Sequence, residues 1–179
     1  MRPAAFRVAL YEFVADMNRY LAEHATGLDF AAVAAQVKSP LVKKIVDGLI
    51  GADAVPEATY REALNVHRPA LQDAYRRYFS TRGVAAMLFP TTPLPAAPIG
   101  QDDSVLLNGV EAPTLATYIR NLGPGSAAGL PGLSLPAGMT AAGLPVGFAL
   151  DGPDGSDHAL LAIGLALEAL LPRLPAPVL

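Results

Sequence analysis

Residues 121–150 contain no charged side chain. An uncharged run of this length could cross a bilayer as a helix. Four prolines and seven glycines lie within the run, however, and in lipid they would leave many backbone groups without hydrogen-bond partners. The run therefore predicts the buried centre of a β-sheet rather than a membrane span.

The charge of the chain is unevenly distributed. Of the 179 residues 52% are hydrophobic, which supplies the core of roughly one domain. Only 16% are charged, against roughly a quarter in an average soluble domain. Residues 83–179 hold 2 basic and 7 acidic side chains, whereas residues 1–82 hold 11 and 9. Because a free surface usually carries more charge, we expect a partner or a further part of the chain to cover much of residues 83–179.

Charge and cysteine content exclude several classes of function. A formal net charge of −3 gives no basic field for nucleic acid, and Lys43 and Lys44 are expected on a solvated helix face. The absence of cysteine excludes disulfides and thiolate chemistry, and it fits a cytoplasmic protein. Arg7, Glu12 and Asp16 interrupt the first apolar segment, so neither a signal peptide nor a membrane partner is expected.

Residues 1–82 predict a helical layer. Apolar residues recur there at intervals of three and four, which is the spacing of one helix face. Asp29 and Ser39 are expected to cap two of the helices, since their side chains can accept hydrogen bonds from free amides. Helices are expected over residues 6–21, 30–37, 40–48 and 56–79.

Residues 83–179 predict the sheet-forming part of the same incomplete domain. The apolar run 84–89 predicts a strand buried on both faces. Asn108-Gly109 predicts a tight hairpin, because both residues tolerate positive φ. A short helix is expected over 113–122, an irregular loop over 123–132, and strands over 133–136 and 146–150.

A last helix is expected after Ser156, with the serine side chain as its cap and Pro172 as its end. Its periodicity predicts a single apolar face against the sheet. That face would consist of Leu160, Leu161, Ile163, Leu167 and Leu170.

No set of residues within the chain forms a convincing active site by spacing. Ser156-Asp157-His158 holds the residue types of a hydrolase triad, but neighbours in a helical first turn cannot hydrogen-bond in series, which favours a capping role. The three histidines have no ligand spacing, so neither a metal nor another cofactor is expected. The glycine-rich stretch 123–129 lacks the Lys-Ser/Thr ending of a phosphate loop, which leaves nucleotide binding as the weakest alternative.

Acidic residues are expected at solvated turns. Asp102 and Asp103 lie in a polar loop, and Asp151 and Asp154 flank glycines. Spacing alone does not select an acid–base pair from them.

Four phrases of the second half resemble a known family. They are Leu88-Phe89-Pro90-Thr91-Thr92-Pro93, Gly129-Leu130-Pro131 with Ser134-Leu135-Pro136-Ala137-Gly138, Gly143-Leu144-Pro145-Val146-Gly147, and Asp151-Gly152-Pro153. In order and spacing they resemble the C-terminal part of the amidase signature family. The long N-terminal helices and the last helix, with Glu168, extend the resemblance over essentially the whole chain. Within the family, Ile119-Arg120-Asn121 and the segment after Leu150 look most like indoleacetamide and mandelamide hydrolases.

The resemblance implies an α/β fold, a mixed sheet with flanking helices, of which only the C-terminal part is present here. The family's enzymes hydrolyse amides with a nucleophilic serine, a second serine and a lysine base. Those residues normally lie in the N-terminal half, and this sequence lacks the Gly-Ser-rich segment that holds the serines. No catalytic role is therefore assigned to any residue, and the chain alone is expected to be inactive.

The resemblance also indicates a substrate pocket. Ala116, Ile119, Gly123 and Ser126 are the candidates to line its acyl side, and ordinary helix and loop packing is the alternative. Many relatives have asparagine at the position of Ser126. A role of that asparagine in holding the backbone is therefore not transferred to Ser126. The tRNA-dependent amidotransferase subunits usually carry an acidic residue just before this loop, but Arg120 and its neighbours offer none, which favours an apolar or aromatic amide.

The expected partners are a small-molecule amide and the missing N-terminal catalytic half or a partner subunit. An unpaired inner sheet edge also predicts homodimers or aggregation. The alternative from another class is a non-catalytic α/β interaction module that associates through its uncharged half.

Overall fold

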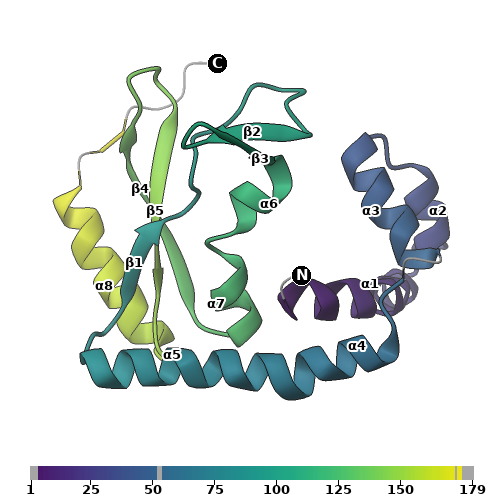
Figure 1. Ribbon diagram of the computed structural model, residues 1–179, viewed down its shortest axis with the longest axis horizontal. Helices are drawn as coiled ribbons and strands as arrows, with labels where there is room; N and C mark the ends of the chain where they lie inside the picture. The colour runs from purple at the N-terminus through teal and green to yellow at the C-terminus, as the bar shows by residue number, and fades with distance from the viewer. Residues whose placement is uncertain (1–3, 52–53, 172, 175–179) are drawn as a thin grey trace. The chain divides into compact units, whose positions relative to one another are not determined.

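The computed structural model describes residues 4–51, 54–171 and 173–174 (Figure 1). Contacts between residues divide the chain into two units, Met1–Pro69 and Ala70–Leu179. Helices and strands are both present, which confirms the α/β class. The predicted layers, 1–82 and 83–179, have a different boundary from these units. It lies where the secondary structure changes from helices to strands. As a division of the complete fold they stay a prediction.

The first unit is helical. It contains α1 (Ala4–Glu23), α2 (Phe30–Ala35), α3 (Pro40–Ile50), α4 (Glu57–Glu62) and the π-helical turn η1 (Ala63–His67). Asp29 and Ser39 cap α2 and α3 as predicted, and the Asp29 carboxylate accepts a hydrogen bond of 2.8 Å from the Ala32 amide. The core of this unit consists of Phe30, Ala34 and Val46, with Val14, Met17, Val37 and Leu49 packed around them.

The helix predicted over 56–79 is interrupted by η1. The amide of Arg68 donates to the carbonyl of Ala63, five residues back, instead of four. Pro69 follows at once, and a proline ring clashes with the carbonyl four residues before it and offers no N–H. The π turn accommodates this proline, and α5 (Arg68–Arg82) continues the helical path. The sequence prediction missed the interruption because the apolar stripe continues through it.

Two antiparallel sheets form the centre of the second unit. The larger has the order β1-β5-β4, with β1 (Met87–Pro90), β5 (Pro145–Asp151) and β4 (Gly132–Met139). The smaller is the predicted hairpin of β2 (Ser104–Leu107) and β3 (Val110–Pro113). Asn108 and Gly109 have φ of 53° and 79°, as that tight turn requires. The uncharged run thus supplies a central strand, β5, and an edge strand, β4.

Helices lie on both faces of the larger sheet (Figure 1). On one side is α8 (Asp157–Leu170), and on the other are α6 (Thr114–Ile119) and α7 (Gly123–Ala128). The core under α8 consists of Leu135, Leu150 and Leu160, joined by Leu133, Phe148, Ile163 and Leu167. Leu161 and Leu170 were predicted to face the sheet, but they are 55% and 81% exposed. The prediction was wrong for these two residues, because leucines and alanines lie on more than one side of α8 and its periodicity does not single out one face.

The segment 123–132 was predicted to be an irregular loop, but its first part is the helix α7. Pro124 lies in the first turn, where its fixed φ suits a helix and its missing N–H costs nothing. Gly129 ends the helix with φ of 77°, and the amides of Gly129 and Leu130 donate to the carbonyls of Ser126 and Gly125. This is a Schellman cap. Loop-like composition therefore concealed a helix with regular start and stop signals.

Ser156 precedes α8 but does not cap it with its side chain. Its hydroxyl is buried without a hydrogen-bond partner among the described residues. The oxygen lies against Gly152, where an added Cβ would be 2.4 Å away. The predicted side-chain cap is therefore wrong, because this side chain turns into the packed bend after β5. The predicted stop, Pro172, lies outside the described residues, and α8 ends at Leu170.

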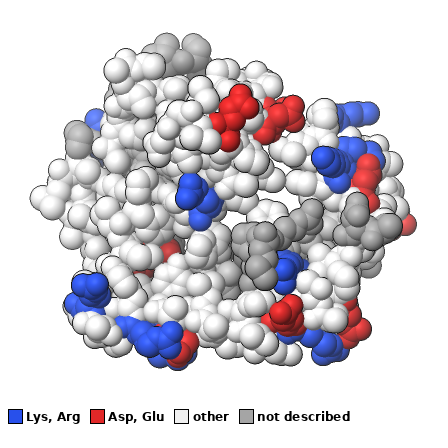
Figure 2. All heavy atoms as spheres, in the orientation of Figure 1, with Lys and Arg blue, Asp and Glu red and all other residues white. Residues whose placement is uncertain are grey.

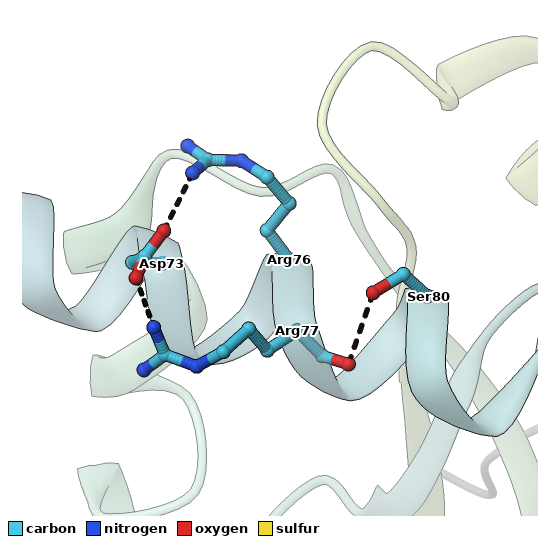
Figure 3. A network of polar contacts seen from close by, with 4 residues as sticks. All are labelled: Asp73, Arg76, Arg77 and Ser80. Atoms are coloured by element: carbon cyan, nitrogen blue, oxygen red, sulfur yellow. Dashed lines mark hydrogen bonds and ion pairs between the residues drawn. The ribbon is translucent and has the colours of Figure 1, made fainter.

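The outer face of α5 carries paired charges. Asp73 accepts hydrogen bonds from Arg76, at 2.7 Å, and from Arg77, and the Ser80 hydroxyl donates to the Arg77 carbonyl (Figure 3). These side chains are largely exposed, so the ion pairs contribute at most about 1 kcal/mol each. The carboxylate offsets part of the local positive charge.

Candidate functional site

Three of the four phrases that carry the family resemblance contribute residues to one hollow in the second unit. Its volume is about 620 Å³. It is walled by β1, the proline-rich segment after it, the middle of β4 and the start of β5. Residues that are distant in sequence thus meet around one surface, although none of the phrases has an obvious chemical task by itself. The residues that line it include Thr91, Ser134, Leu135, Gly147 and Phe148.

Two hydroxyl groups join the strands at this hollow. The Oγ1 of Thr91 and the Oγ of Ser134 are 2.8 Å apart, and the amide of Thr91 donates to the carbonyl of Gly147 at 3.1 Å. A Cβ at Gly147 would lie 3.0 Å from the carbonyl oxygen of Leu135 and 3.1 Å from Thr91 Oγ1. Glycine at 147 is therefore what lets the strands and the Thr91 segment approach one another so closely.

Helix α6 and the turn after it are each tied to the wall of the hollow by one side chain. The Tyr118 hydroxyl donates to the carbonyl of Pro95 at 2.6 Å, and Asn121 Nδ2 donates to the carbonyl of Pro90 at 2.8 Å. Prolines at 93, 95 and 98 cannot pair as a strand, so these contacts fix a segment that has little secondary structure of its own. The wall and the end of α6 are thereby held as one structure.

Removing the Tyr118 hydroxyl tests this tie. We expect Tyr118→Phe to lower the free energy of unfolding by about 0.5–1.5 kcal/mol, the usual net value of one hydrogen bond. Urea unfolding of the 179-residue chain measures the difference. Tyr78→Phe, at a 41% exposed tyrosine of α5, is the matched control and should change stability by less. Equal losses in the two variants would contradict a specific role for Tyr118.

Helix α7 packs against a buried carboxyl group. Asp151 ends the central strand β5, opposite Met87 of β1 and Gly132 of β4, and it is 7% exposed. A Cβ on Gly125 would lie 2.4 Å from its Oδ2 atom, so the carboxyl group lies directly on the α7 backbone. No hydrogen-bond partner of that oxygen is found among the described residues.

Burial shifts the pKa of the Asp151 carboxyl group. Loss of hydration raises the pKa of Asp151, because burial penalises the charged form. Tyr75 of α5 has a raised pKa, first because it is partly buried and second because of the charge of Asp151. Asp151 was predicted to be a solvated turn residue, and that was wrong: it belongs to the end of β5 and not to the turn. Asp102, Asp103 and Asp154 are exposed, as predicted.

Comparison with known proteins shows which family this chain resembles. The family model described as Amidase matches residues 1–161. The indoleacetamide hydrolase of Agrobacterium vitis is 48% identical over 165 residues, which are 92% of this chain and 35% of that protein. The mandelamide hydrolase of Pseudomonas putida is 34% identical, over 95% of this chain and 34% of that protein.

The chain belongs to the amidase family. It spans about a third of the length of the relatives that it matches and corresponds to their C-terminal portion. A solved structure described as a crystal structure of amidase is 32% identical, with a TM-score of 0.73 over 94% of this chain and 35% of that chain. The peptide amidase of Stenotrophomonas maltophilia, 22% identical with a TM-score of 0.61, shares the fold. The predicted resemblance to a C-terminal amidase portion is confirmed.

The four predicted pocket residues of this amidase segment lie on consecutive helices. Ala116 and Ile119 are one helical turn apart on α6, and Gly123 and Ser126 are one turn apart on α7. Ala116 and Ser126 are exposed, whereas Ile119 and Gly123 are half-buried. None of the four lines the hollow, which is built from the signature phrases instead. Their role in substrate binding stays a prediction.

Sequence reasoning missed the hollow and the buried acid. The signal for the hollow was present, since most of its lining comes from three of the phrases that revealed the amidase family, but strand pairing was needed to join them. Asp151 directly follows the apolar run of β5, a continuity that could have placed it in the strand. Among the residues that the structure describes, no group of three or more His, Asp or Glu side chains is placed to hold a metal ion. Nor is any of their helices long and apolar enough for a membrane span.

Proposed function

We propose that this chain is the C-terminal part of an amidase that hydrolyses an aryl- or indole-acetamide to a carboxylate and ammonia. One observation carries the proposal: 92% of the chain matches an indoleacetamide hydrolase at 48% identity, while only 35% of that enzyme is matched. The chain therefore corresponds to a substantial but incomplete part of such an enzyme.

The chemistry is proposed to depend on residues outside this chain. A serine hydroxyl attacks the amide carbon while a neutral lysine, acting through a second serine, takes up the hydroxyl proton. Backbone amides stabilise the oxyanion, and the amide nitrogen takes up the proton from the lysine and leaves as ammonia. Water then hydrolyses the acyl-enzyme to release the carboxylate. None of Lys38, Lys43 and Lys44 lies in the sequence context of the family's lysine, and the chain has no Gly-Ser-rich segment.

The proposed contribution of this chain is substrate recognition. Ala116, Ile119, Gly123 and Ser126 would border the acyl group, and all four are small or apolar residues. Space supports this at Gly123, because an added Cβ would meet no atom within 4 Å. An aromatic acyl group suits such a border, and Arg120 would not hold a substrate ammonium group.

A chimera tests the proposal. The A. vitis indoleacetamide hydrolase is joined, without its own matched region, to this chain, and ammonia release is measured with indole-3-acetamide and mandelamide. We expect turnover by the chimera and none by the 179-residue chain alone. Turnover by the chain alone would disprove the claim that the nucleophile lies elsewhere. A folded chimera that hydrolyses neither amide would disprove the substrate class.

A further inference from the structure

The outward side of α8 is apolar and exposed. Leu161 and Leu165 are 55% and 69% exposed, and the alanines Ala162, Ala166 and Ala169 are exposed beside them. These five residues are here called the outer α8 surface. The opposite side of the helix already fills the core with Leu160, Ile163 and Leu167. Apolar residues on two opposite sides are typical of a helix that is covered on both of them.

Charge is scarce around this surface. The polar side chains of α8 are Asp157 and His158 in its first turn and Glu168 near its end. On the face shown in Figure 2, the region over α8 and the sheet is almost entirely white, whereas charged side chains gather along α5. An exposed apolar area with so few charges is typical of an interaction site.

The neighbouring strand is also incomplete. Helix α8 packs on β4, and Gly164 allows this contact, since an added Cβ would lie 2.3 Å from Leu133 Cδ2. Among the described residues, β4 pairs with β5 alone, so its other edge has no partner strand. The exposed helix face thus belongs to a helix that packs on an edge strand.

We propose that the outer α8 surface is the packing site for the N-terminal part of the amidase fold, whether that part lies on the same chain or on a separate one. This inference rests on the proposed function, because it takes its occupant from the amidase relatives. In those relatives this segment is 35% of the length, so the remainder is about twice as long as the segment itself. A body of that size can cover the helix and also continue the sheet past β4.

A second copy of this chain fits the surface less well. A 14-residue helix is about 21 Å long and about 10 Å wide, so one face of it offers only a few hundred Å². A stable dimer interface buries about 800 Å² on each partner. A two-fold contact through α8 would also leave the edge of β4 unpaired unless the strands met at the same time.

The test is co-expression of the chain with a tagged N-terminal segment of the A. vitis enzyme, namely the part that precedes its matched region. We expect the two to purify together and to sediment as a one-to-one complex. The variant Leu161→Gln/Leu165→Gln should weaken the complex at least about tenfold, because it removes apolar contacts at the centre of the interface. Glutamine favours helices, so α8 should persist in circular dichroism spectra.

The matched control is Leu106→Thr/Val110→Thr in the β2–β3 hairpin. These two residues are 63% and 68% exposed, comparable with the α8 pair, and threonine suits strands. The control should form the complex as the unaltered chain does. Failure of the unaltered chain to form a complex, or equal binding by both variants, would overturn the inference. A homodimer of the chain alone that the α8 variant abolishes would also overturn it.

Complex formation and amide hydrolysis test the packing site and the proposed activity separately. Assay of the purified complex on indole-3-acetamide tests the proposed function. A complex that depends on Leu161 and Leu165 but releases no ammonia would support the packing site and count against the proposed activity.

Discussion

Gly125→Ala is expected to destabilise the second unit by about 1–3 kcal/mol, the usual cost of forcing an extra methyl group into a packed interior. The added Cβ would lie 2.4 Å from Asp151 Oδ2 and 2.9 Å from its Cγ. Asp151 cannot easily withdraw, because its strand is paired on both sides, with β1 and with β4. Either α7 or the end of β5 must therefore shift. Urea unfolding at neutral pH measures the loss.

Gly123→Ala, two residues earlier in the same helix, is the matched control. Its Cβ would meet no atom within 4 Å, so the variant should be neutral or slightly stabilising. The double variant Gly125→Ala/Asp151→Ala should recover much of the loss, since the clash needs both groups. Equal losses in the two glycine variants, or additive losses in the double variant, would contradict the contact.

Asp151→Asn is expected to stabilise the chain near neutral pH and to flatten its pH dependence. Burial raises the folded-state pKa of Asp151 above the unfolded value of about 3.9. Between the two pKa values the folded state binds more protons, so stability falls as pH rises. The contribution is fully present below the unfolded pKa and is lost as pH rises through the folded one. At neutral pH the buried oxygen without a partner costs about 1–3 kcal/mol, a cost that a neutral amide of the same shape reduces.

Thermal or urea unfolding across acidic to neutral pH measures this difference. The stabilities of the two proteins should converge at low pH, where Asp151 is protonated in both states. Asp154→Asn is the control, because Asp154 is exposed in the adjacent turn and should leave the pH profile unchanged. An effect of Asp151→Asn that is the same at every pH would mean that charge is not its cause.

Local elements followed from local signals. Asp29 and Ser39 cap helices as predicted, and Asn108-Gly109 forms its turn, because such features depend on side chains and backbone within a few residues. The helix α7 was missed because glycine and proline are read as loop residues unless their positions are considered. The π turn was missed because a proline's effect depends on the surrounding helix.

The candidate site was less predictable than the fold. The phrases around Thr91, Ser134 and Gly147 identified a family, but the hollow that they form appears only when β1, β5 and β4 are in register. Asp151 looked like a turn residue until the strand was seen to extend through it. Leu161 and Leu170 looked like core residues, because periodicity counts apolar side chains and does not indicate which face another element covers.

The sequence by itself determined the α/β class, the helical first part, the hairpin and, through its Gly-Leu-Pro phrases, membership of the amidase family. The absence of charge from 121 to 150 also indicated that this region is built to be covered. Only the tertiary structure decided that β5 is central and β4 an edge, that α8 has an uncovered apolar side, and that Asp151 is buried on Gly125. The physical reason is that burial depends on which residues distant in sequence come together, whereas caps, turns and composition act within a few residues of the chain.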